Sequence, residues 1–166
     1  MIQKKICLLG GFAVGKTSLI RRFVTNLFSE TYQTTIGVTI EKKTLRVADQ
    51  DLTLMIWDLY GEDEFQKMRE SYVRGAAGYI LVADGTRRAT LDSAETLQQL
   101  AQSILGPVPF VLIVNKADRR QEWEIDEPTL ARLRDQGWPV LTGSAKTGDG
   151  VPELFVQLSQ KLLGAT

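Results

Sequence analysis

One glycine-rich segment near the start of the chain constrains the fold and the chemistry more than any other stretch. It fits the pattern G-x-x-x-x-G-K-[ST], whose fixed positions are filled by Gly10, Gly15, Lys16 and Thr17. A hydrophobic strand pattern, Ile6 to Leu9, leads into the segment, and apolar residues at helical spacing follow it. Strand, glycine loop and helix start are the context in which this pattern binds phosphate. A glycine-containing turn that binds nothing is the alternative interpretation.

The backbone N–H groups of such a loop and the positive end of the following helix form a cradle for phosphate oxygens. We expect Lys16 to reach the β- and γ-phosphates as a point charge, and the Thr17 hydroxyl to ligate Mg²⁺. Further contacts are expected from the rest of the loop, namely Gly10, Phe12, Ala13, Val14, Gly15 and Ser18. The segment therefore predicts a combined phosphate and magnesium site.

Composition narrows the remaining possibilities. The 166 residues carry 20 basic and 20 acidic side chains, so no net field attracts nucleic acid or an anionic membrane. The chain has no histidine and one cysteine, Cys7, which excludes a disulfide framework and histidine-based chemistry. The longest apolar runs, 76–83 and 108–114, are too short to span a bilayer, and no lipidation signal is present. We expect one domain over residues 1–166, a cytoplasmic monomer with no membrane anchor and no nucleic-acid partner.

Strand and helix patterns alternate along the chain, which is typical of an α/β fold with a mainly parallel sheet. The predicted strands are Ile6 to Leu9, Val38 to Val47, Leu52 to Trp57, Ala77 to Ala83, Val108 to Val114 and Val140 to Thr142. The link between the second and third strands is too short for a parallel crossover, so these two strands must be antiparallel.

Helical patterns separate these strands. They run from the glycine loop to Leu27, cover part of 62–74, and span Thr90 to Leu105, Glu127 to Gly137 and Val151 to Leu162. Residues 28–37 are polar and show no periodicity. We therefore expect the three-layer fold of P-loop NTPases: a six-stranded mixed sheet, with five parallel strands and one antiparallel edge strand, and about five helices on both faces.

Polar signals follow several of the predicted strands, and ligands of open α/β sheets bind at the carboxyl ends of strands. Asp58 and Gly61 follow the strand that ends at Trp57. A carboxylate there can hold Mg²⁺ through water, and the glycine N–H can contact a γ-phosphate, although this D-x-x-G pattern also fits an ordinary turn. Ser144-Ala145-Lys146 follows the last strand, where its backbone amides could meet the O6 atom of a guanine. That triplet is common by chance and counts only through its position.

Asn115-Lys116-Ala117-Asp118 follows the buried strand ending at Val114. The Asp118 carboxylate can accept hydrogen bonds from the N1–H and the 2-amino group of guanine, whereas adenine offers neither donor in this arrangement. Losing two charge-assisted hydrogen bonds costs on the order of 10²- to 10⁴-fold in affinity. The stem of Lys116 can cover the base, and Asn115 can tie this loop to the phosphate loop. The segment therefore predicts selection of guanine, with a polar turn at a strand end as the alternative.

These four signals, with these intervening strands, resemble the Ras superfamily of small GTPases over essentially the whole chain. The chain is most similar to the Rab branch in three segments, Thr35-Ile36-Gly37-Val38, Ile56-Trp57-Asp58 and Ser71-Tyr72-Val73-Arg74-Gly75-Ala76. The resemblance implies that Phe28 packs on the guanine, that Tyr32 shields the phosphates, and that Thr35 joins Thr17 on Mg²⁺ in the GTP state.

The resemblance also implies a switch that binds GTP or GDP with Mg²⁺ and hydrolyses GTP. Residues 28–38 and 58–75 would change with the nucleotide and contact effector, exchange-factor and GTPase-activating proteins. Trp57 and Tyr72 fall where Rab proteins display part of an aromatic effector surface, and Ile40 takes the place of its third aromatic residue.

Three departures from the family pattern bear on hydrolysis. Glu62 occupies the place of the glutamine that orients the attacking water, beside the expected catalytic residues Lys16 and Thr35. Its carboxylate can accept a hydrogen bond from water, but it lacks the amide donor and adds charge near anionic oxygens, at a cost of about 1 kcal/mol at 4 Å even in water. Tyr60 stands where a small residue is usual, and Phe12 and Ala13 replace small loop residues beside the γ-phosphate. We therefore expect slow intrinsic hydrolysis, unless Glu62 is only a solvated residue and another group positions the water.

Two other classes of function stay open on these residues. The chain is alternatively a GTP-binding interaction module with negligible turnover, which the substitutions at Phe12, Tyr60 and Glu62 favour. An ATP-dependent kinase or ATPase would share the phosphate loop, but the segment ending at Asp118 argues against an adenine pocket.

Overall fold

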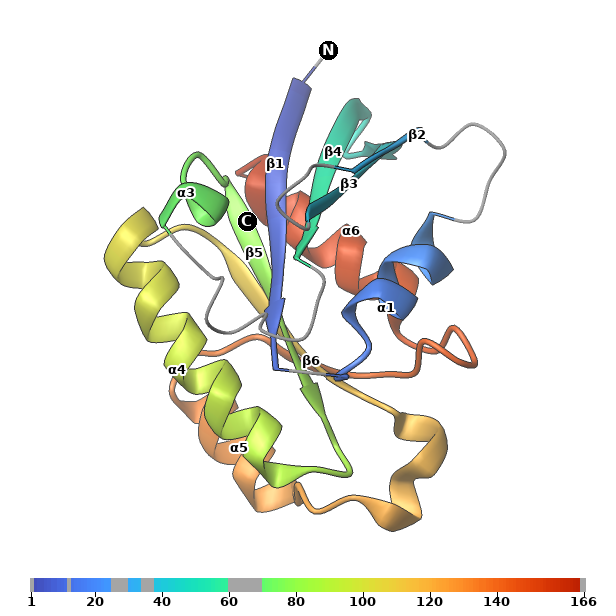
Figure 1. Ribbon diagram of the computed structural model, residues 1–166, viewed down its shortest axis with the longest axis vertical. Coiled ribbons are helices and arrows are strands. Elements are labelled where there is room, and N and C mark those ends of the chain that lie inside the picture. Colours follow the sequence, from blue (N-terminus) through green and yellow to red (C-terminus); the bar gives the residue numbers. More distant parts are fainter. Residues whose placement is uncertain (1, 12, 25–29, 34–37, 60–69, 165–166) are drawn as a thin grey trace.

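Five of the seven strands in the described sheet are parallel, and their order brings the candidate loops to one edge of the molecule. The computed structural model describes residues 2–11, 13–24, 30–33, 38–59 and 70–164. The strands are β1 Ile2–Gly10, β2 Glu30–Gln33, β3 Val38–Val47, β4 Gln50–Leu59, β5 Gly78–Asp84, β6 Phe110–Asn115 and β7 Val140–Thr142. Their order in the sheet is β2-β3-β4-β1-β5-β6-β7, and all neighbours from β4 to β7 are parallel (Figure 1).

The expected mixed sheet is confirmed, with β3 antiparallel to β4. Ala48 and Asp49 join these two strands with φ angles of 52° and 62°, which are the values of a two-residue type I′ hairpin turn. The structure adds one strand, β2, which pairs antiparallel with the outer edge of β3. It lies inside the segment 28–37, where the sequence shows no alternation. A short edge strand pairs through its backbone, so it needs no alternating side-chain pattern.

Helices cover both faces of the sheet. The short α3 Glu70–Val73, α4 Arg88–Leu105 and α5 Glu127–Asp135 pack on one face, and α1 Lys16–Phe23 and α6 Val151–Leu162 pack on the other (Figure 1). Alternation along the strands divides the core accordingly: Cys7 and Leu9 of β1 face α4, whereas Ile6 and Leu8 face α1 and α6. Burial raises the pKa of the Cys7 thiol to about 12, so this residue is a protonated core side chain.

Two helix ends have side-chain partners that satisfy their backbone groups. The side chain of Asp126 caps α5 by accepting a hydrogen bond from the backbone N–H of Thr129 at 3.0 Å. The helix α1 ends at Phe23, earlier than the apolar pattern to Leu27 predicts, and Lys43 of β3 donates a hydrogen bond to the carbonyl of Phe23. A cation at that point satisfies a terminal carbonyl and complements the helix dipole. No helix in the ranges given above has both the length and the apolar character needed to cross a bilayer.

Candidate functional site

The phosphate loop lies between the end of β1 and the start of α1. Ala13 and Gly15 have φ angles of 59° and 102°, and a Cβ atom at Gly15 would collide with the side-chain amide of Asn115. A Cβ atom at Gly10 would lie 2.7 Å from the carbonyl oxygen of Val82 in β5. The two glycines of the motif are therefore required by the close approach of their neighbours. Lys16 is only 5% exposed and occupies the first position of α1.

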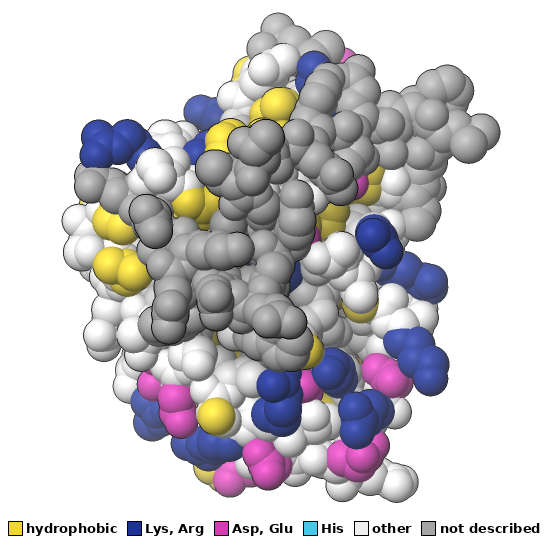
Figure 2. Space-filling model, viewed as in Figure 1, with side chains coloured by type: hydrophobic (Ala, Val, Ile, Leu, Met, Phe, Trp, Pro, Cys, Tyr) yellow, Lys and Arg dark blue, Asp and Glu magenta, His cyan; other side chains and the backbone are white. Residues whose placement is uncertain are grey.

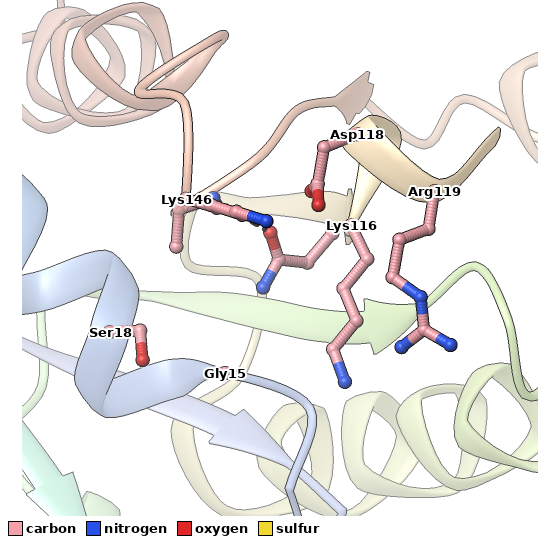
Figure 3. A pocket seen from close by; sticks show the side chains of 8 residues that line it. Gly15, Ser18, Lys116, Asp118, Arg119 and Lys146 are labelled. Carbon is pink, nitrogen blue, oxygen red and sulfur yellow. Dashed lines mark hydrogen bonds between the residues drawn. The ribbon is translucent and has the colours of Figure 1, made fainter.

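Two adjoining cavities open beside this loop. One, of about 330 Å³, is lined by the loop itself and the first turn of α1, together with Lys116. The other, of about 430 Å³, is lined by Gly15, Ser18, Asn115, Lys116, Asp118, Arg119, Ala145 and Lys146. Figure 3 shows Asp118, Lys116 and Arg119 on the segment that follows β6, with Lys146 on the segment that follows β7 and Gly15 and Ser18 on the phosphate loop and α1. Because the cavities share Gly15, Ser18 and Lys116, one elongated ligand can occupy both.

A hydroxyl and a carboxylate meet at the start of α1. Thr17 Oγ1 donates a hydrogen bond to Asp58 Oδ2 at 2.5 Å, and Asp58 is 2% exposed. The second oxygen, Oδ1, is buried and has no hydrogen-bond partner among the described residues. Burial raises the pKa of Asp58, although the hydrogen bond from Thr17 and the charge of Lys16 oppose that shift. A buried carboxylate oxygen beside a threonine hydroxyl, next to a phosphate cradle, suits Mg²⁺ and its bound water.

Asn115 joins three loops with one side chain. Its amide nitrogen donates to the carbonyl oxygen of Val14 in the phosphate loop at 3.0 Å. Its amide oxygen accepts from the backbone N–H of Ala145, in the segment after β7, at 3.1 Å. The residue is 2% exposed, so neither bond competes with bulk water. The expected tie between the loop after β6 and the phosphate loop is confirmed.

Asp118 lies on the wall of the larger cavity. Ser144 Oγ donates a hydrogen bond to Asp118 Oδ1 at 2.6 Å. This hydrogen bond lowers the pKa of Asp118, and the nearby charges of Lys146 and Arg119 act in the same direction. Asp118 is therefore an ionised, acceptor-only group at neutral pH. A purine edge with two adjacent donors is the complement of such a group.

Lys116 is held through its side chain by a residue that the sequence analysis missed. Lys116 Nζ lies 2.9 Å from Asp84 Oδ2 and donates to the Ala13 carbonyl at 3.4 Å. Asp84 ends β5, is fully buried, and also accepts hydrogen bonds from Thr86 and Arg87. Burial opposes its ionisation, but the hydrogen bonds from Lys116, Thr86 and Arg87 outweigh burial and lower the pKa of Asp84 to about 2. The available signal was its position, an acidic residue directly after an apolar strand.

The structure brings most of the predicted site residues together around these cavities. They are Gly10, Ala13, Val14, Gly15, Lys16, Thr17, Ser18, Asp58, Asn115, Lys116, Asp118, Ser144, Ala145 and Lys146. Five further predictions, Phe12, Phe28, Thr35, Gly61 and Glu62, fall outside the described residues, and Tyr32 belongs to β2, which is described through its backbone. Arg119, which lines the larger cavity, was not anticipated.

The expected aromatic surface is reduced to one partly exposed ring. Tyr72 is 5% exposed, and its hydroxyl donates to the carbonyl of Trp57 at 2.7 Å. Trp57 is partly exposed, but Lys5 Nζ lies 3.7 Å from the centroid of its ring. Tyr72 therefore belongs to the core, and a cation covers Trp57. Elsewhere on the face shown in Figure 2, basic and acidic side chains are interspersed over the lower part of the molecule.

A glycine loop between the first parallel strand and its helix, at the carboxyl edge of this sheet, defines the P-loop class of nucleotide-binding proteins. The sequence model of the Ras family matches residues 5–164. The chain is 32% identical over 166 residues to Ras-related protein Rab-7b of Bos taurus, covering 98% of this chain and 83% of that protein. It is 31% identical over 161 residues to Ras-related protein Rab-4 of Dictyostelium discoideum, covering 96% of this chain and 78% of that protein.

Ras-related protein Rab-1 of Theileria parva is 33% identical over 161 residues, covering 95% of this chain and 73% of that protein. The chain belongs to the Ras family, and it is Rab-like within it. Its class is therefore that of the small GTPases, which are guanine-nucleotide-binding switches.

Proposed function

We propose that this protein binds GTP and GDP with Mg²⁺ and hydrolyses GTP slowly, as a single-domain switch. The observation that carries the proposal is the Asn115 side chain, which ties the phosphate loop to both segments that line the larger cavity. A nucleotide bound there would have its phosphates in the loop cavity and its base in the larger cavity. The carboxylate of Asp118 would then select guanine through the two donors on its edge.

The phosphate end would be held by groups whose positions support that role. Lys16, at the start of α1, would neutralise the β- and γ-phosphates, and the loop N–H groups would donate to their oxygens. Thr17, and Asp58 through water, would hold Mg²⁺, with Thr35 joining them in the GTP state. When bound, the metal ion supplies positive charge that stabilises the transferring phosphoryl group.

Hydrolysis would proceed by in-line attack of water on the γ-phosphorus, which breaks the bond to the β,γ-bridging oxygen and releases GDP and phosphate. In this chain Glu62 would stand beside that water. Its carboxylate accepts a hydrogen bond from the water but cannot donate one to the developing charge, which is the physical reason for the slow rate proposed here. Gly61 would contact the γ-phosphate, so that loss of this phosphate releases residues 58–75 together with residues 28–38. Phe28 and Tyr32 would close over the base and the phosphates.

Effector, exchange-factor and GTPase-activating proteins would bind to residues 28–38 and 58–75. The protein would be a cytoplasmic monomer.

A second candidate function retains nucleotide binding but has negligible GTP hydrolysis. In that case the protein is a GTP-binding interaction module, which the carboxylate at Glu62 and the bulk of Phe12 favour. Phosphate release measured in a single turnover, with and without an activating protein, separates the two candidates. Release in neither condition supports the interaction module.

The guanine assignment is tested by calorimetry on protein stripped of nucleotide. We expect GDP to bind at least 100-fold more tightly than ADP, because adenine leaves the Asp118 carboxylate without its two donors. Removal of Mg²⁺ with a chelator should accelerate GDP release. Equal affinity for GDP and ADP would overturn the guanine assignment, and tighter binding of ADP would favour an adenine-nucleotide enzyme.

A further inference from the structure

The carbonyl oxygen of Lys116 accepts two hydrogen bonds. The first comes from the backbone N–H of Arg119 at 2.9 Å and closes the turn that carries Asp118. The second comes from the indole N–H of Trp123 at 2.8 Å. A carbonyl oxygen has two lone pairs, so both are used here. Lys116 has a φ angle of 73°, a left-handed conformation that a residue with a side chain rarely adopts, so these bonds stabilise a backbone that is otherwise unfavourable.

Trp123 is itself seated against the end of β5. A Cβ atom at Gly85 would overlap the indole ring, so only glycine leaves room for the ring at this position. The N–H of Gly85 donates to the carbonyl of Asn115 at 3.1 Å, and the carbonyl of Gly85 accepts from the N–H of Glu124 at 2.8 Å. Gly85 is therefore hydrogen-bonded both to Asn115, which begins the segment 115–118 (the proposed guanine loop), and to the residue after Trp123. The loop, the end of β5 and the indole ring form one connected unit.

Two further side chains, those of Asp84 and Arg120, help to hold Lys116 and the Trp123 ring in place. The residue before Gly85 is Asp84, whose carboxylate holds the ammonium group of Lys116 at 2.9 Å. The guanidinium carbon of Arg120 lies 4.0 Å from the centroid of the Trp123 ring. Trp123 lines neither cavity, so it would not touch a bound nucleotide. Lys116 is thus fixed at its ammonium group by Asp84 and at its carbonyl by Trp123.

We propose that Trp123 is a positioning residue for guanine recognition, an inference that rests on the function proposed above. Its indole N–H fixes the carbonyl that begins the turn bearing Asp118, and so sets the direction of the carboxylate that would meet the base. The hydrogen bond slows nucleotide release and sharpens the choice of guanine over bases that offer fewer donors. Sequence reasoning does not find this role, because the tryptophan follows the recognised loop and reaches it only through the short 3₁₀ helix η1 Ala117–Glu122.

The test is the substitution Trp123→Phe, which keeps an aromatic ring and removes the N–H. The matched control is Trp138→Phe, because Trp138 packs against Phe110 and lines neither cavity. Release of GDP from the Trp123 variant should be about fivefold faster than from the parent, as expected for the loss of one hydrogen bond. Its preference for GDP over inosine diphosphate, which lacks the 2-amino group, should fall in the same proportion.

A variant that is only less stable would lose affinity for both nucleotides equally and would keep its preference. Unchanged release and preference in Trp123→Phe, with a parent that prefers GDP, would overturn the positioning role alone. A parent with no preference for guanine over adenine nucleotides would overturn the proposed function, and the positioning role with it.

A second measurement does not depend on how the Trp123 variant folds. In a protein carrying Trp57→Phe and Trp138→Phe, Trp123 is the one remaining tryptophan, since the chain has three. Its emission should change when GDP is released, at the rate of release, because the indole hydrogen bond reports on the guanine loop. Emission that stays constant through release would count against coupling between this ring and the site.

Discussion

The side-chain amide nitrogen of Asn115 donates a hydrogen bond to the backbone carbonyl of Val14, 101 positions earlier in the chain, at 3.0 Å. The amide oxygen of the same side chain accepts from Ala145 at 3.1 Å. The amide carries its donor and its acceptor on two separate atoms, so it can bond to groups on two different loops at once. An aspartate at this position would lose the donor. A residue with a Cβ atom at position 15 would collide with the Asn115 amide nitrogen, so the contact also requires Gly15. One buried residue therefore fixes the distance between the two ends of the candidate nucleotide site.

Asn115→Ala removes both hydrogen bonds and leaves two backbone groups unpaired. We expect GDP to dissociate about 10- to 100-fold faster, because each bond contributes about 1 kcal/mol and both hold the site in its binding geometry. Release of a fluorescent GDP analogue measures this rate. The control is Gln102→Ala, which removes an exposed amide hydrogen bond on α4. Equal release from the two variants would contradict the role given to Asn115.

The residues whose position could be read from the sequence are those that follow a buried strand. Asp58 and Asn115 lie at the carboxyl ends of apolar strands that the pattern locates, and the carboxyl ends of parallel strands meet at one edge of a sheet. Asp84 obeys the same rule. Its role was missed because a lone acidic residue matches no motif, and its partner Lys116 is 2.9 Å away only in the folded chain.

The features that sequence reasoning did not find depend on tertiary contacts. Trp123 reaches Lys116 because η1 turns the chain back and Gly85 leaves space for the ring. Neither condition produces a periodic pattern. Tyr72 was placed on a surface from family resemblance, yet it is 5% exposed and its hydroxyl donates to the carbonyl of Trp57 at 2.7 Å, with the carbonyl of Leu8 3.3 Å away. Aromatic residues with a polar tip can face either way, and only the packing decides.

Asp118→Asn should change which base the site prefers. The amide keeps an oxygen that can accept from Ser144, but it presents an N–H₂ donor where guanine also presents donors. We expect GDP affinity to fall on the order of 10²- to 10⁴-fold, while affinity for xanthosine diphosphate, whose C2 carbonyl accepts that donor, rises.

Competition between the two diphosphates measures this change. Asp149→Asn makes the same chemical change at an exposed position after β7 and should leave the preference for GDP intact. An Asp118 variant that still prefers GDP would show that the base is recognised elsewhere.

Glu62→Gln restores the amide donor whose absence underlies the slow hydrolysis proposed here. Single-turnover phosphate release should be at least about tenfold faster, since one donor aimed at developing charge can change a rate on the order of 10²- to 10³-fold. GDP affinity should stay the same, because the change is felt only at the γ-phosphate. The control is Glu95→Gln, which alters an ion pair with Arg132 between helices α4 and α5. A Glu62→Gln variant no faster than the parent would show that another group positions the water.

The protein should lose stability in acid, because protonation of the Asp84 carboxylate removes its stabilising contribution. Its pKa is about 2 in the folded protein against an ordinary value of 3.8, because hydrogen bonds from Lys116, Thr86 and Arg87 outweigh the effect of burial. A group whose pKa is depressed by folding stabilises the protein above the unfolded pKa, and this contribution is lost as pH falls from about 4 to 2. The contribution amounts to about 2 kcal/mol at neutral pH.

Asp84→Asn removes this titrating group and leaves Lys116 without its anionic partner. The free energy of unfolding, measured by urea denaturation of GDP-bound protein, should therefore be lower than the parent value at pH 6, and the gap should narrow as the pH approaches 2. Asp92→Asn, at an exposed position of α4, should follow the parent curve throughout. A gap that stays constant between pH 6 and pH 2 would mean that the charge of Asp84 does not stabilise the fold. The Asp84–Lys116 contact would then act through its shape alone.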